Sequence, residues 1–115
     1  MQLIEETAEE ITVLEPHGRI DSATAPEFGE RLNRLLEAGR TAILVNLQNV
    51  AFVSSAGFHA LLLANRTAVE RHSRLVLCGL LDEVRRLFEI GGFIEQFLIC
   101  QSRDEGLERL KQLPR

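Results

Sequence analysis

The sequence predicts an α/β fold in one domain over residues 1–115: a mainly parallel sheet of about five strands, an N-terminal antiparallel strand and about four covering helices. Two observations predict it. Continuous apolar runs at Ala42 to Leu47 and Arg74 to Gly79 are typical of strands buried on both faces of a sheet. Segments with apolar residues at helical spacing alternate with these runs through short connections, which favours right-handed crossovers between parallel strands.

The N-terminus is predicted to form two short strands. Gln2 to Glu6 and Ile11 to Glu15 carry the pattern, and a glutamate-rich turn joins them. Pro16 and Gly18 are expected to end the second strand, because both residue types interrupt strands.

A helix is expected next. Thr24 is predicted to cap it, since Glu27 three residues later completes a capping box and Pro26 suits a first turn. Gly39 is a natural left-handed stop. The apolar face of this helix comprises Phe28, Leu32, Leu35 and Leu36.

After the buried run at Ala42 to Leu47, Gln48 to Val53 is predicted to be a loop. A second helix is expected to follow Ser54-Ser55-Ala56-Gly57. Its inward side is predicted to comprise Phe58, Leu61, Leu62, Asn65 and Val69.

The last third repeats the alternation. Asp82 is predicted to cap a third helix that ends at Gly91-Gly92, Phe97 to Cys100 to form a strand, and Asp104 to start a terminal helix. The apolar residues of these two helices are Val84, Leu87 and Phe88, and then Leu107, Leu110 and Leu113.

The composition excludes several classes of function. The net charge is −4 and Arg and Lys are scattered, so no basic stripe is available for nucleic acid. The start MQLIEETAEE has no secretory pattern, and no apolar run approaches the roughly 20 residues of a membrane span. Cys78 and Cys100 lie in apolar runs, as buried free thiols do in a reducing compartment. We expect a cytoplasmic protein with neither a nucleic-acid nor a membrane partner.

Catalytic signatures are missing from the sequence. There is no glycine-rich phosphate loop and no G-x-S-x-G elbow. His17, His59 and His72 show no metal-ligand spacing. We therefore expect a binding protein without metal or cofactor, and not an enzyme.

The most informative segment is Ser54-Ser55-Ala56-Gly57, where a strand region passes into a helix. Serine is a favoured helix cap, and from this context alone about four in five such serines would be only that. A helix N-terminus also tolerates a phosphate, because its free N–H groups and dipole favour negative charge. Gly57 would allow another backbone to approach closely. Position alone does not decide between a cap and a phosphorylation site.

Several segments together resemble the STAS domain, specifically the short single-domain anti-sigma factor antagonists of bacteria. The resemblance covers nearly the whole chain, and its strength lies in the order and spacing of its parts. They are GRID at Gly18 to Asp21, TAPEF at Thr24 to Phe28, LVNL at Leu44 to Leu47, FVSSAGF at Phe52 to Phe58, LVLCG at Leu75 to Gly79 and RLFEIGGF at Arg86 to Phe93.

The family pattern at the switch is usually D-S-S-G, with the first serine phosphorylated. The resemblance therefore implies Ser55 as the acceptor. Ser54 replaces the usual acidic residue and leaves a competing hydroxyl, and Ala56 replaces the second serine. The expected partner-contact positions are Asp21, Ser54, Ser55, Ala56, Gly57 and Phe58. For Phe58 a place in the core is expected more often than one in an interface, and Asp21 fits a local turn equally well.

The resemblance implies partner switching by a monomer. The unphosphorylated antagonist binds an anti-sigma factor of the histidine-kinase-like ATPase type, which frees a sigma factor or another regulated protein. The same ATPase phosphorylates the antagonist with ATP and magnesium, and a metal-dependent serine phosphatase resets it. The antagonist supplies only the acceptor hydroxyl and a docking surface.

Two alternatives belong to other classes. Some STAS domains are accessory domains of lipid or anion transport systems; such a role often dispenses with a phosphorylatable serine, so the retention of Ser55 weighs against it. Others are parts of larger signalling assemblies, which normally carry an additional N-terminal domain.

Overall fold

A computed structural model describes residues 1–113 as a mixed sheet with helices on both faces. The elements, in chain order, are β1 (Gln2–Ala8), β2 (Ile11–Ile20), α1 (Ala25–Glu37), β3 (Ala42–Asn46), β4 (Val50–Val53), α2 (Ser55–Glu70), β5 (Arg74–Cys78), α3 (Asp82–Ile90), the short 3-10 helix η1 (Ile94–Gln96), β6 (Leu98–Cys100) and α4 (Arg103–Gln112). The α/β prediction is confirmed.

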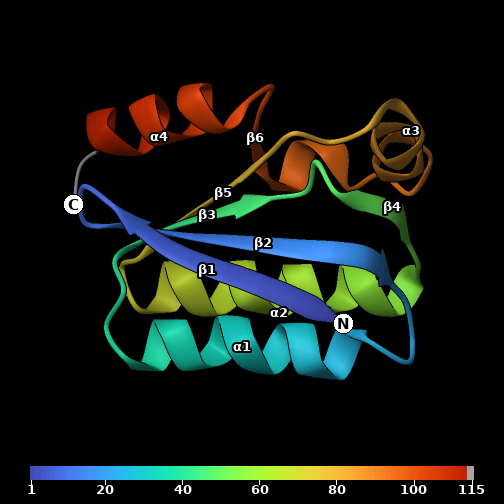
Figure 1. The fold of residues 1–115 in the computed structure, drawn as a ribbon, viewed down its shortest axis with the longest axis horizontal. Helices are drawn as coiled ribbons and strands as arrows, with labels where there is room; N and C mark the ends of the chain where they lie inside the picture. The colour runs from blue at the N-terminus through green and yellow to red at the C-terminus, as the bar shows by residue number, and fades with distance from the viewer. Residues whose placement is uncertain (114–115) are drawn as a thin grey trace.

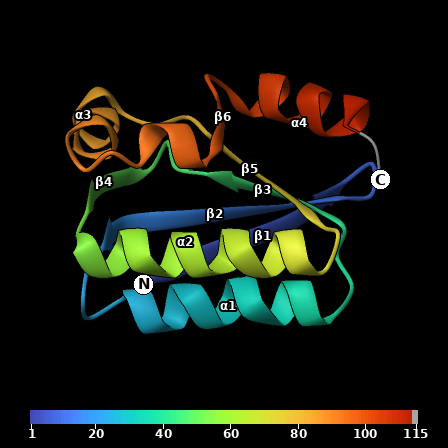
Figure 2. The same ribbon diagram turned by 180° about the vertical axis from the view of Figure 1, so that it is seen from behind.

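Within residues 1–113, six strands form the sheet. Their order is β1-β2-β3-β5-β6, and β4 lies off this path, paired with the last residues of β2. Among the strands of the described residues, only β1 is antiparallel to its neighbour, and the other four pairings are parallel. Helices α1 and α2 lie side by side on one face, whereas α4 covers the other (Figures 1 and 2). None of the helices within residues 1–113 is long and apolar enough to cross a bilayer.

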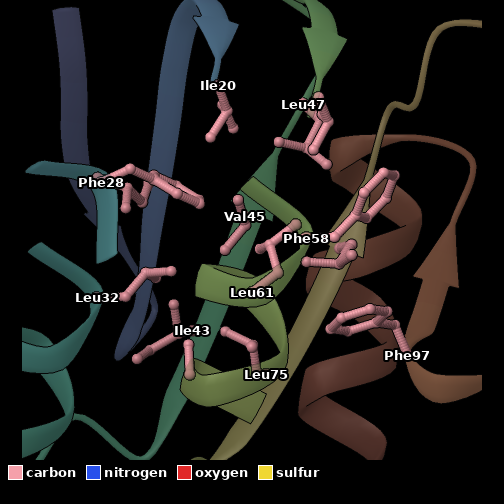
Figure 3. Close-up of a cluster of buried hydrophobic side chains, with 14 of the residues drawn as sticks. Ile20, Phe28, Leu32, Ile43, Val45, Leu47, Phe58, Leu61, Leu75 and Phe97 are labelled. Carbon is pink, nitrogen blue, oxygen red and sulfur yellow. The ribbon is translucent and has the colours of Figure 1, made fainter. Parts of the chain in front are cut away.

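Each face of the sheet buries its own core. Beneath α1 and α2 lies the larger cluster, to which Phe28, Ile43 and Leu61 belong (Figure 3). A smaller cluster lies between the sheet and α4 and includes Leu44, Cys78 and Leu110. Successive side chains of β3 point to opposite faces of the sheet, so Ile43 belongs to the larger cluster and Leu44 to the smaller one.

The predicted end of the second strand at Pro16 and Gly18 is wrong. Strand β2 pairs with β3 through Thr12 to Leu14 and then with β4 through Gly18 to Ile20. Pro16 lies between these two pairings, where its missing N–H costs no ladder bond to β3 or β4. Gly18 has a φ of 108° at a register shift, a conformation that suits glycine.

The predicted loop over Gln48 to Val53 is also wrong in part, because Val50–Val53 forms strand β4 beside β2. On α2, the prediction that Val69 faces inward is wrong: its side chain is 68% exposed, and Ala64 and Ala68 are buried instead. The predicted polar exception on this helix, Asn65, donates its amide to the Gln96 carbonyl.

The predicted helix caps differ from the observed ones. Thr24 occupies the N-cap position of α1, but its hydroxyl donates to the Arg19 carbonyl oxygen at 2.7 Å, so no capping box forms. Asp82 lies inside the first turn of α3, after Leu81 at the N-cap. The terminal helix begins at Arg103, where the hydroxyl of Ser102 accepts from the Glu105 N–H.

Candidate functional site

The predicted site lies at the carboxyl ends of two neighbouring parallel strands. Ile20 at the end of β2 is in register with Val53 at the end of β4. Asp21 follows the first strand and Ser54 follows the second, and the Ser54 N–H donates to the Ile20 carbonyl at 2.9 Å. The structure therefore brings Asp21 to the start of α2, although 33 positions separate it from Ser54 in the chain.

Neither serine side chain makes a capping hydrogen bond to α2. Ser54 occupies the N-cap position of α2, but its hydroxyl oxygen is buried and makes no hydrogen bond to residues 1–113. Ser55 is the first helical residue, and its side chain is exposed. The first turn of α2 contains no acidic residue. This helix N-terminus thus keeps its positive dipole end open towards an exposed hydroxyl.

Asp21 is held in place as an anion. Its Oδ1 accepts hydrogen bonds from the N–H groups of Ala23 at 3.0 Å and Thr24 at 3.2 Å. These bonds, chiefly the one from Ala23, lower the pKa of the Asp21 carboxyl below its ordinary value, with a smaller contribution from Arg19. The Arg19 Nε lies 3.8 Å from Asp21 Oδ2. Asp21 therefore carries its charge at neutral pH and also shapes the turn into α1.

Gly57 brings α2 close to the strand ends. A Cβ at this position would lie 2.7 Å from the Ile20 carbonyl oxygen and 2.8 Å from a methyl group of Val53. The close backbone approach that the sequence suggested for a partner is thus made within the chain itself. It fixes the first turn of α2, and with it Ser55, against β2 and β4.

Phe58 belongs to the core. Its side chain is 6% exposed and points among the buried residues in Figure 3. Its ring stacks on Phe93 with centroids 4.5 Å apart and meets Phe88 edge-on at 4.7 Å. Of the six residues singled out from the sequence, Gly57 and Phe58 are buried, Asp21, Ser54 and Ala56 are half-buried, and Ser55 is exposed.

The sequence did not single out Arg19 and Phe52, which lie opposite one another on β2 and β4. The Arg19 guanidinium lies over the Phe52 ring, 4.4 Å from its centroid, and remains largely exposed. The sequence predicts a loop where the structure has β4, so it gives no reason to expect Arg19 and Phe52 to lie opposite one another. Within residues 1–113, no cluster of three or more His, Cys, Asp or Glu side chains could hold a metal ion.

The sequence of this chain matches a known domain family and several named relatives. The family model of the STAS domain matches residues 2–106. BtrV of Bordetella bronchiseptica, named as a candidate anti-sigma factor antagonist, is 32% identical over 99 residues, 85% of each chain. The anti-sigma-B factor antagonist of Staphylococcus aureus is 33% identical over 75 residues, 65% of this chain and 69% of its own.

Solved structures share the fold. An anti-sigma factor antagonist from Mycobacterium paratuberculosis superposes with a TM-score of 0.88 at 19% identity, over 96% of this chain and 94% of its own. The phosphorylated form of the Bacillus protein SpoIIAA gives 0.71 at 19% identity, over 94% and 98%. A sulfate transporter family protein from Wolinella succinogenes gives 0.76 at 20% identity, over 92% and 88%. The fold alone therefore does not distinguish an anti-sigma factor antagonist from a domain of a sulfate transporter. The family model and the sequence relatives identify the family: this chain belongs to the STAS domain family, among the anti-sigma factor antagonists.

Proposed function

We propose that this protein is an anti-sigma factor antagonist whose partner binding is reversed by phosphorylation of Ser55. The unphosphorylated form binds an anti-sigma factor of the histidine-kinase-like ATPase type and so releases the protein which that factor holds. The ATPase transfers the γ-phosphoryl group of ATP to the Ser55 hydroxyl, and a metal-dependent serine phosphatase removes it. The chain contributes the acceptor and the docking surface, and the catalytic groups belong to the two enzymes.

The observation that carries the proposal is the exposed Ser55 hydroxyl at an uncapped helix N-terminus. A phosphate there adds about −1.5 to −2 charges, which the dipole of the 16-residue helix α2 tolerates. The fold of the antagonist is expected to survive the modification. Its effect then falls on whatever packs against this surface.

The choice between the two serines rests on burial. The Ser54 hydroxyl oxygen has almost no access to solvent, whereas Ser55 is exposed. A kinase must place the γ-phosphorus within reach of the acceptor oxygen, so Ser54 would first have to leave its position between the strand ends. Ser55 is therefore the acceptor that needs no rearrangement of the antagonist.

Charge explains why the partner would be released. Asp21 is already an anion beside this surface, and a phosphate on Ser55 adds to its field. Burying the added dianion against acidic or apolar partner groups costs several kcal/mol, and about 2.7 kcal/mol already lowers affinity roughly a hundredfold. Because Gly57 holds the first turn of α2 against the strands, the phosphate has little freedom to swing away.

The test uses four baits in a lysate of the source cells: the wild-type chain, Ser55→Ala, Ser55→Asp and, as the matched control, Ser54→Ala. We expect Ser55→Ala to retain a histidine-kinase-like ATPase, Ser55→Asp to lose it, and Ser54→Ala to behave as the wild type. Phosphate should be found on Ser55 of the wild type. Recovery of membrane-transport components by all four baits, without such an ATPase, would refute the switch and favour the transport-accessory role.

A further inference from the structure

A groove of about 540 Å³ runs along the outer surface between α1 and α2. Its floor consists of small residues, because Gly29 and Ala60 let the two helices approach: a Cβ on Gly29 would lie 3.5 Å from the Ala60 Cβ. Leu63 lines one wall and is 46% exposed. A mostly apolar hollow of this size, with a large exposed leucine on its wall, is typical of a binding surface.

The shape of the groove suits a helix. Since β2, β3, β4 and β5 are parallel, α1 and α2 return in the same direction and lie side by side in both views of the ribbon (Figures 1 and 2). The α2 side of the groove extends from Ala56 to Thr67, about 16 Å at 1.5 Å per residue. This length accommodates about three turns of a third helix, with its apolar stripe on the small-residue floor.

The groove is continuous with the phosphorylation surface. Ser22 and Ala56 line it at the end where both helices begin. Ala56 follows Ser55 directly, and Ser22 follows Asp21. A partner that covers the Ser55 hydroxyl therefore also covers the start of the groove.

The acidic side chains beside the groove already have cationic partners. The Glu30 carboxylate pairs with the Arg34 guanidinium, and Glu27, one turn earlier on α1, lies 3.5 Å from the N-terminal ammonium group. The contact with an occupant is therefore expected to come mainly from its apolar stripe, packed on the small-residue floor.

From this continuity and shape we infer that the groove between α1 and α2 receives the apolar stripe of an amphipathic helix from the anti-sigma factor kinase. The inference rests on the proposed function. It adds a docking contact, separate from the acceptor serine, which holds the kinase while Ser55 is phosphorylated.

The test measures phosphorylation kinetics with the purified kinase obtained in the pull-down. Leu63→Glu places a charge in the groove, and Val69→Glu places the same charge on an exposed position of α2 outside it. Leu63→Glu is expected to raise the KM for the antagonist roughly tenfold, with kcat within about twofold of the wild type. Val69→Glu should change neither. Thermal unfolding of all three proteins checks that each is folded.

The outcomes separate the inference from the proposed function. If Leu63→Glu and the wild type share one KM, the docking groove is refuted while the switch at Ser55 stands. If the kinase does not phosphorylate even the wild type, both fail. A wild-type dimer in sedimentation that Leu63→Glu dissociates, with unchanged kinase kinetics, would assign the groove to a second copy of this chain and overturn the inference.

Discussion

Gly57→Ala tests the close approach of α2 to the strand ends. The new Cβ would lie 2.7 Å from the Ile20 carbonyl oxygen, whereas ordinary contacts begin at 3.4 Å, and backbone must move to relieve it. Overpacking costs about 1–3 kcal/mol, and a weakened hydrogen bond between Ser54 and Ile20 adds about 1 kcal/mol. Replacing a helical glycine returns about 1 kcal/mol. We expect a net loss of about 1–3 kcal/mol in the free energy of unfolding.

Gly29→Ala is the matched control, because its Cβ would lie at an ordinary 3.5 Å from the Ala60 Cβ. It should keep the wild-type stability or gain up to about 1 kcal/mol. Urea unfolding measures the stability of the wild type and of both variants. The midpoint of Gly57→Ala should lie about 1–2 M of urea below that of the wild type. A Gly57→Ala protein as stable as Gly29→Ala would refute the reasoning that this glycine positions the first turn of α2.

Three further predictions concern stability and reactivity. Arg74→Met removes the donor to the last carbonyls of α4, at 2.6 Å for Leu110, and should cost about 1–3 kcal/mol with faster hydrogen exchange in α4; unchanged exchange there would contradict it. The folded-state pKa of Asp21 lies below its ordinary 3.8, so the stability from its carboxylate is present above that pH and is lost as the pH falls through the folded pKa. The stability difference between the wild type and Asp21→Asn in urea should therefore shrink with acidification, and a constant difference would refute the role of these hydrogen bonds. Burial raises the pKa of the Cys78 thiol to about 12, so an aromatic disulfide reagent at neutral pH should label it only after unfolding, and rapid labelling of the folded protein would contradict its burial.

The elements with strong local signals were predictable from the sequence. The apolar runs at Ala42 to Leu47 and Arg74 to Gly79 became the buried strands β3 and β5. Strand β4 is an apolar run of only four residues, too short to predict a strand by itself, and it is a strand because it pairs with Gly18 to Ile20. The hydrophobicity of Val69 predicts an inward side chain, but the structure buries the smaller Ala64 and Ala68 on this helix instead.

The candidate site was predictable to the same extent. The sequence predicts that a helix follows Ser54 and Ser55, and α2 begins at Ser55, but the strand β4 directly before it lies where the sequence predicts a loop. The prediction that Phe58 faces inward is confirmed by its burial, whereas the burial of Gly57 could not be read from sequence order, because it depends on β2 and β4 ending side by side. The groove was likewise hidden, since it arises from small residues on two helices that only the sheet brings together.

The central claim is that a phosphate on Ser55 controls partner affinity. Calorimetric titration of the purified ATPase with the antagonist, before and after phosphorylation at Ser55, tests it most directly. We predict a loss of affinity of roughly a hundredfold or more, which phosphatase treatment restores. Equal affinity of the two forms would contradict the account.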